Sequence, residues 1–152
     1  MEYDFITDER EALYLVEEFG STLRYVLNQT PKVCLAAVKQ TGLALQHVRE
    51  QTQEICLEAV KKDGRALLYV NKQTEEICME AVKENGLMLS CVHEQTYDIC
   101  LAAIKNNDMA LLYVRDQTPE ICLAAVRQNG LTLQYVHNQT PEICMVAVQN
   151  DG

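Results

Sequence analysis

The sequence has little that would carry the protein out of a cell or into a membrane. No stretch of the 152 residues approaches the ~20 apolar residues of a membrane-spanning helix. The first residues, MEYDFITDER, lack the basic and apolar segments of a secretory signal peptide. We therefore expect an intracellular, cytoplasmic protein without a membrane partner.

Basic residues are scarce. Lys and Arg number 13 against 22 Asp and Glu, which gives a net charge of −9. Residues 1–28 hold seven acids and two bases, and residues 73–94 hold five acids and one base. This balance gives no support for binding nucleic acid or anionic lipid. It leaves open an acidic decoy that occupies a nucleic-acid-binding protein.

Motifs of enzymes and metal sites are missing as well. We find no glycine-rich phosphate loop and no serine with suitable triad partners, so we expect no catalytic residue and no enzyme. There is no C-x-x-C pair. His93 and His137 lie two repeats apart, ~16–20 Å at ordinary helix spacing, too far to share a metal ion. We therefore expect no metal and no cofactor.

What the chain does contain is a 22-residue repeat without insertion or deletion, clearest as QTPEICLAAVRQNGLTLQYVHN at residues 117–138. A Gln-Thr pair opens each copy, at Gln29, Gln51, Gln73, Gln95, Gln117 and Gln139. A strict period of this length is typical of a solenoid.

Cysteine follows the same period, at Cys34, Cys56, Cys78, Cys100, Cys122 and Cys144. Neighbouring helices pack ~8–10 Å apart, whereas a disulfide needs Cα atoms within ~7 Å. We therefore expect free thiols that pack in the core as small apolar groups.

Each repeat predicts two helices. Thr is a good N-cap, and the prolines fall at the first helical position. Asn-Gly or Asp-Gly then indicates a left-handed C-cap. In the following short helix, Leu133 and Val136 have the i,i+3 spacing of one helical face. A leucine-rich-repeat strand is the alternative for this second segment.

We predict an all-α fold, an α-solenoid of about six helix-turn-helix repeats in one domain. Residues 1–28 form a divergent N-terminal capping repeat. Full repeats occupy residues 29–50, 51–72, 73–94, 95–116 and 117–138, and residues 139–152 form a half repeat. Helices of ~10 and ~7 residues are too short to be stable alone, so cooperativity must come from stacking.

The strings AAVKQTGLALQHV, AAVRQNGLTLQYV and EAVKKDGRALLYV resemble the AAVKQNG-type helical repeat of the family called domain of unknown function 4116. The resemblance covers residues 29–152 closely and residues 7–28 weakly. It implies an all-helical array of a kind abundant in giant DNA viruses, acting in the host cytoplasm or the virion, with no assigned activity.

The short helices offer two sets of equivalent positions as a candidate surface for a protein or peptide partner. One set is Gln46, Leu68, Ser90, Leu112 and Gln134, and the other is Arg49, Asn71, His93, Arg115 and His137. The alternative is that these positions lie on a solvent-exposed face and vary without binding a partner. We expect a non-enzymatic scaffold for protein–protein interaction, with a purely structural or assembly role as a further alternative.

The last helix predicts self-association. The usually polar position of this helix is Val146, and Val148 follows it. A solenoid end without a polar cap leaves apolar surface in water. Either the chain belongs to a longer array or another copy covers this end, most simply in a two-fold homodimer that buries both valines.

Overall fold

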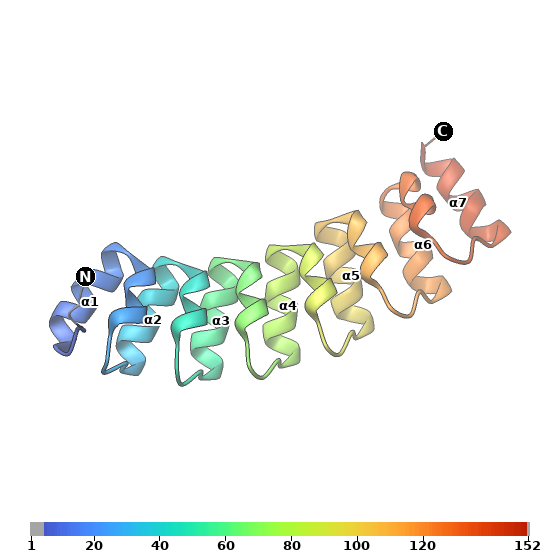
Figure 1. Ribbon diagram of the computed structural model, residues 1–152. Coiled ribbons are helices and arrows are strands. Elements are labelled where there is room, and N and C mark those ends of the chain that lie inside the picture. Colours follow the sequence, from blue (N-terminus) through green and yellow to red (C-terminus); the bar gives the residue numbers. More distant parts are fainter. Residues whose placement is uncertain (1–4, 152) are drawn as a thin grey trace. The chain divides into compact units, whose positions relative to one another are not determined.

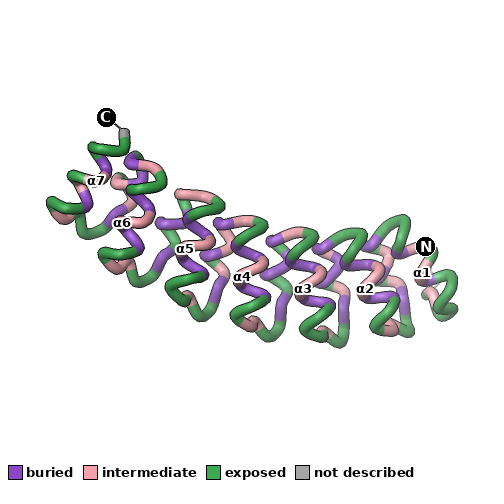
Figure 2. Tube along the Cα trace, turned by 180° about the vertical axis from the view of Figure 1, so that it is seen from behind, coloured by how far each residue is buried: buried purple, intermediate pink, exposed green. Residues whose placement is uncertain are grey.

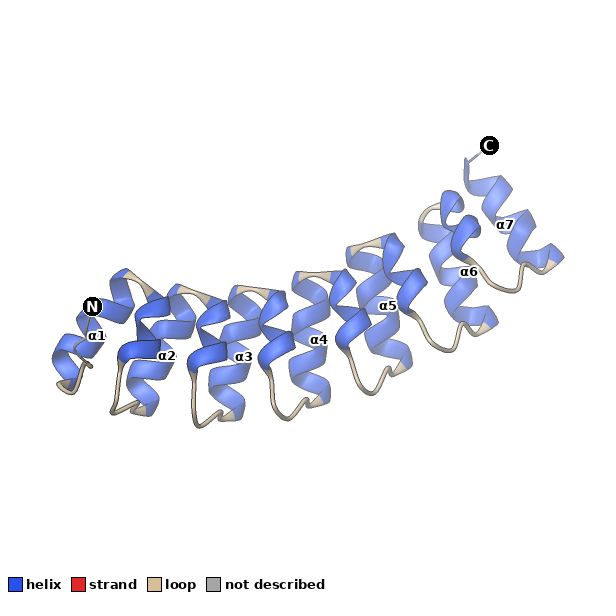
Figure 3. Cartoon of the chain, in the orientation of Figure 1, coloured by secondary structure: helices blue, strands red, loops and turns tan. Residues whose placement is uncertain are grey.

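The structure is a computed structural model that describes residues 5–151. Residues 1–4 and Gly152, which belong to the predicted capping repeat and half repeat, lie outside the described residues. Helices joined by short loops make up the described chain, as predicted (Figure 3). Within residues 5–151 extended backbone pairs once, in a bridge between Ile6 and Val26. The leucine-rich-repeat alternative is therefore wrong.

Seven α-helices alternate with six 3-10 helices in the described chain. The α-helices are α1 (Glu9–Glu18), α2 (Pro31–Gln40), α3 (Gln53–Lys62), α4 (Glu75–Glu84), α5 (Tyr97–Asn106), α6 (Pro119–Gln128) and α7 (Pro141–Asp151). The 3-10 helices are η1 (Gly20–Tyr25), η2 (Gly42–His47), η3 (Gly64–Tyr69), η4 (Gly86–Cys91), η5 (Asp108–Tyr113) and η6 (Gly130–Tyr135).

The α-helices begin where the sequence predicts. The hydroxyl of Thr118 accepts a hydrogen bond from the Ile121 N–H at the start of α6, and the other repeat threonines do the same. In α1 the Asp8 carboxylate takes this place and accepts from the Glu11 N–H at 2.9 Å. Each cap satisfies a backbone donor that the helix itself cannot pair.

The second segment of each repeat is a 3-10 helix. With three residues per turn, positions i and i+3 stack directly above one another, which suits the spacing that predicted a helix here. The predicted left-handed C-cap is wrong. Asn129, between α6 and η6, has an extended φ of −153°, and no residue of the described chain has a positive φ. The Asn129 side chain instead accepts from the Leu131 N–H at 3.0 Å and so caps η6.

A glycine at the start of a 3-10 helix, such as Gly42 in η2, is needed for a reason other than a left-handed turn. A β-carbon at Gly42 would lie 2.5 Å from the Ala59 carbonyl oxygen of α3. Gly42 itself is buried at this contact. Glycine is thus required at Gly20, Gly42 and Gly86, where the start of the 3-10 helix touches the backbone of the next α-helix.

The chain divides into two compact units, one up to Ala81 and one from Val82, with the boundary inside α4. In the first unit α1, α2 and α3 pack side by side as one layer, and η1, η2 and η3 form a second (Figure 1). In the second unit α5, α6 and α7 form one layer and η4, η5 and η6 the other. Helices α2, α3, α5 and α6 each pack on the 3-10 helix of the preceding repeat as well as on that of their own repeat.

The core lies between these two layers. Burial follows the same positions in each repeat, so the buried segments recur along the trace (Figure 2). In α2 the buried residues are Val33, Cys34, Ala37 and Val38, and Leu45 of η2 is fully buried. No single repeat could enclose these side chains, because the next repeat supplies the other wall.

Candidate functional site

The structure places the first predicted set of surface positions on exposed sites of five 3-10 helices. The polar members turn back on their own helix: Gln46 donates to the Leu43 carbonyl at 3.0 Å, and Ser90 donates to the Leu87 carbonyl at 2.8 Å. Gln134 likewise donates to the carbonyl of Leu131. Leu68 and Leu112, which have no such bond to make, remain 58% and 44% exposed.

Two arginines of the second set connect neighbouring repeats. The Arg49 guanidinium donates to the Leu27 carbonyl at 2.7 Å and to the Val26 carbonyl at 3.3 Å. Arg115 makes the equivalent bonds to the carbonyls of His93 and Val92 in the second unit, both at 2.8 Å. Both arginines therefore stabilise the contact between two neighbouring repeats. Asn71, His93 and His137 are exposed at the equivalent positions of the other repeats.

Four exposed apolar side chains on the 3-10 helices are absent from the predicted sets. Tyr69 is next to Leu68, and Met109 and Tyr113 share η5 with Leu112. Leu131, on η6, is 66% exposed. We call Leu68 and Tyr69 the first patch, and Met109, Leu112, Tyr113 and Leu131 the second patch.

The signal for this patch in the sequence is the i,i+3 spacing of Met109 and Leu112. With three residues per turn, Met109 stands directly beside Leu112, one turn earlier. The second patch is therefore continuous along η5, and Leu131 occupies the position of Met109 on the adjacent η6. The i,i+3 spacing places Met109 and Leu112 on one face of an α-helix as well, so either helix type predicts this pairing.

The Gln-Thr glutamines form a hydrogen-bond ladder between repeats. The Gln117 amide nitrogen donates to the carbonyls of Leu111 and Tyr135, at 3.0 and 3.1 Å. Its amide oxygen accepts from the His137 N–H at 3.0 Å. The Gln117 bridge thus ties the end of η5 to the end of η6, and Gln29 and Gln95 make the equivalent three bonds.

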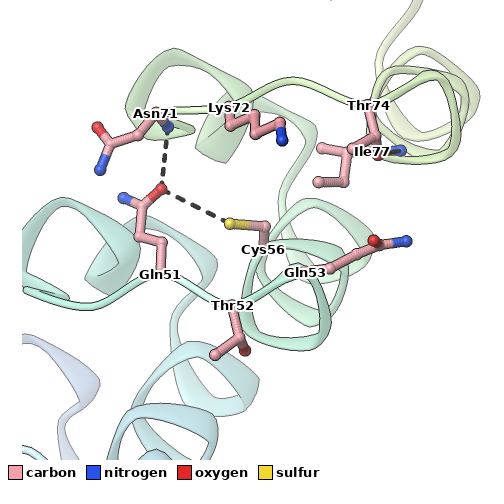
Figure 4. Close-up of a pocket in the computed structure, with 8 residues that line it drawn as sticks. All are labelled: Gln51, Thr52, Gln53, Cys56, Asn71, Lys72, Thr74 and Ile77. Carbon is pink, nitrogen blue, oxygen red and sulfur yellow. Dashed lines mark hydrogen bonds between the residues drawn. The ribbon is translucent and has the colours of Figure 1, made fainter.

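The cysteines take part in this ladder. In the first unit the Gln51 oxygen accepts both the Asn71 N–H at 2.9 Å and the Cys56 thiol at 3.6 Å (Figure 4). Together with Lys72 and Ile77 these residues line a pocket of about 300 Å³ at the loop between two repeats (Figure 4). A pocket of about 310 Å³ occupies the equivalent place in the second unit, between Cys100 and Ile121. Both pockets follow from the repeat geometry.

Five of the six periodic cysteines are buried, as predicted, whereas Cys144 in the last helix is half-buried. Burial raises the pKa of the thiols of Cys34, Cys56, Cys100 and Cys122 above the ordinary value, so these side chains stay neutral. All seven cysteines are free thiols. Among residues 5–151 no group of three or more His, Cys, Asp or Glu could hold a metal ion.

The last α-helix leaves apolar side chains in water. Val148 is 67% exposed and Met145 is 62% exposed, whereas Val146 is half-buried. The predicted self-association through Val146 and Val148 stays a prediction. In the described part of the chain, no helix is long and apolar enough to cross a membrane.

Comparison with known proteins identifies the repeat. The family model described as Domain of unknown function (DUF4116) matches the chain in four overlapping windows, residues 31–73, 52–96, 74–118 and 96–140. No curated protein and no solved structure matches the chain. Successive windows begin 21 or 22 residues apart, so the match follows the repeat seen in the fold. The chain belongs to the DUF4116 repeat family.

Proposed function

We propose that the protein is a non-enzymatic repeat scaffold that binds a partner protein through its 3-10 helices. The observation that supports this proposal is the pairing of exposed apolar and aromatic side chains on η3 and on η5. Leu68 is 58% exposed beside Tyr69, and Leu112 is 44% exposed between Met109 and Tyr113. Large aliphatic and aromatic groups held together in water are typical of interaction sites.

The glutamine ladder supports the same proposal. Gln95 donates to the Tyr113 carbonyl at 2.9 Å and accepts from the Arg115 N–H at 3.0 Å, so it fixes the backbone at the end of η5. A backbone that is already fixed loses little conformational entropy when the surface binds a partner. We infer that the η5 part of the second patch is a preformed surface for apolar side chains of a partner.

An acidic decoy of a nucleic-acid-binding protein is the alternative, and the net charge of −9 is what favours it. The two functions differ in their response to salt, because a decoy would release its basic partner steeply as salt is added. From the family we also propose a viral source and action in the host cytoplasm or the virion. A purely structural or assembly role is a further alternative.

The test begins with a partner protein that is captured from host extract, identified and then purified. We expect Leu112→Glu to weaken its binding about tenfold or more, because a carboxylate would enter a desolvated apolar contact. Affinity should change little between low and high salt. Circular dichroism would verify that the variant keeps its helices.

The matched control is Tyr14→Glu, which makes the same change of charge at an aromatic residue of α1 that is 67% exposed. It should bind as the unmodified chain does. Equal losses for both variants, or none for Leu112→Glu, would contradict the proposal. A steep loss of affinity with salt would favour the decoy instead.

A further inference from the structure

One repeat has an acidic residue where the others have glycine. Asp108 begins η5, at the position of Gly20, Gly42, Gly64, Gly86 and Gly130 in the other repeats. At Gly86 an added β-carbon would collide with the Ala103 carbonyl oxygen of α5. Gly42 meets α3 in the same way in the first unit. This position therefore has no room for a side chain where two repeats stack closely.

Asp108 has the β-carbon that the close contact excludes, so the next repeat must lie farther away. Asp108 is half-buried, whereas Gly86 and Gly130 on either side of it are buried. Within the second unit, α6 packs less closely on η5 than α5 does on η4 or α7 does on η6. Figure 1 shows the correspondingly wider step between α5 and α6.

Side-chain amides hold this junction in place of a close backbone contact. The Asn129 amide donates to the Asp108 carboxylate, and the Gln128 amide donates to the Ile104 carbonyl at 2.9 Å. At the preceding junction of the second unit the Asn106 amide likewise donates to the Lys83 carbonyl, but its oxygen also accepts the backbone N–H of Gly86 at 2.7 Å, next to the close approach of Gly86 to α5. Amides on rotatable side chains can follow a change in distance that a backbone contact cannot.

We propose that the Asp108 junction is a hinge within the second unit. The segment from α6 to α7 opens and closes there against the repeat that ends in η5, while the junctions on either side stay closed. The β-carbon of Asp108 is the cause, because it prevents the close stacking that glycine permits elsewhere. The hinge exists without a partner, and it lies between η5 and η6, the two helices that carry the second patch.

Hydrogen exchange measured by mass spectrometry on the full chain tests this hinge. Opening at the junction exposes the amides of α6 and lets them exchange through local unfolding. Asp108→Gly should slow the exchange of the α6 peptide about tenfold relative to the unmodified chain. Asp108→Asn keeps the β-carbon and an acceptor for Asn129, so it should leave this exchange unchanged.

The reciprocal change is Gly86→Asp, which places the same side chain at the preceding junction and should speed the exchange of the α5 peptide. If Gly86→Asp does not fold, the comparison of Asp108→Gly with Asp108→Asn tests the hinge by itself. An Asp108→Gly chain with unchanged α6 exchange would overturn the hinge. Equal slowing by Asp108→Asn would also overturn it, because the charge and not the β-carbon would then be responsible.

Discussion

Replacing Gln117 by alanine removes one bridge of the glutamine ladder. Its amide makes three bonds to backbone atoms: it donates to the Leu111 and Tyr135 carbonyls and accepts from the His137 N–H, at 3.0 to 3.1 Å. Alanine makes none of them. The loss falls at the junction of two repeats, which depend on one another for stability.

The expected cost follows from those three bonds. A hydrogen bond contributes about 1 kcal/mol to stability, and a buried group left without a partner costs ~1–3 kcal/mol. Gln117 is half-buried, so water can replace part of what is lost. We therefore expect Gln117→Ala to lower the free energy of unfolding by ~2–4 kcal/mol. The matched control is Gln139→Ala: Gln139 is exposed and donates to the Leu133 carbonyl at 2.9 Å, so this change should cost about 1 kcal/mol.

Urea unfolding followed by circular dichroism measures the difference. Because repeat arrays can depart from two-state unfolding, hydrogen exchange of η6 should be measured alongside. Gln117→Ala should speed the exchange of η6 well beyond the effect of Gln139→Ala. Equal costs for the two variants would refute the ladder as a source of stability and leave the repeated Gln-Thr pair as a trace of duplication.

Four further predictions concern other parts of the chain. The native protein should react slowly with a maleimide, with the half-buried Cys91 and Cys144 labelled first; fast labelling of Cys122 would contradict its burial. Burial raises the pKa of the Cys122 thiol, so the neutral thiol stabilises the folded chain. This stability should decline as the pH rises from the ordinary thiol pKa through the raised one, which urea unfolding at several pH values would show. Gly42→Ala should cost ~1–3 kcal/mol in thermal unfolding, because its β-carbon would lie 2.5 Å from the backbone of α3; an unchanged melting temperature would contradict the close approach. Val146→Glu should turn a dimer seen by light scattering into a monomer with the same helical signal, and a wild-type chain that is monomeric at high concentration would disprove self-association through α7.

The repeat made most of the fold predictable. Thr118 and its equivalents marked the helix starts, and the period of the apolar residues marked the core. The 3-10 type of the second helix was not predictable, because over six residues an i,i+3 pair such as Leu133 and Val136 suits both helix types. The Asn-Gly signal was misread for a physical reason. A left-handed cap and a close approach to another helix both require glycine, and the approach of Gly42 to Ala59 is a contact between repeats that local sequence does not encode.

The candidate surface was predictable only in part. Leu68 and Leu112 were among the predicted positions and are exposed. Met109 and Tyr113 were missed because only two sets of equivalent positions were considered, although the i,i+3 spacing places Met109 beside Leu112 in either helix type. Arg115 was predicted from its place in the second set of equivalent positions, and its guanidinium reaches two carbonyls of the preceding repeat. A long polar side chain can bond to the preceding repeat only if the distance between the two repeats allows it.

Photo-crosslinking from two neighbouring positions tests the binding surface most directly. A benzophenone amino acid is placed at Leu112 on η5 in one chain and at Lys105 in another, where the exposed side chain lies on α5 of the same repeat. Each chain is irradiated with the purified partner. We predict a crosslinked product from position 112 and little or none from position 105. Equal crosslinking from both positions, or crosslinking from position 105 alone, would contradict binding through the 3-10 helices.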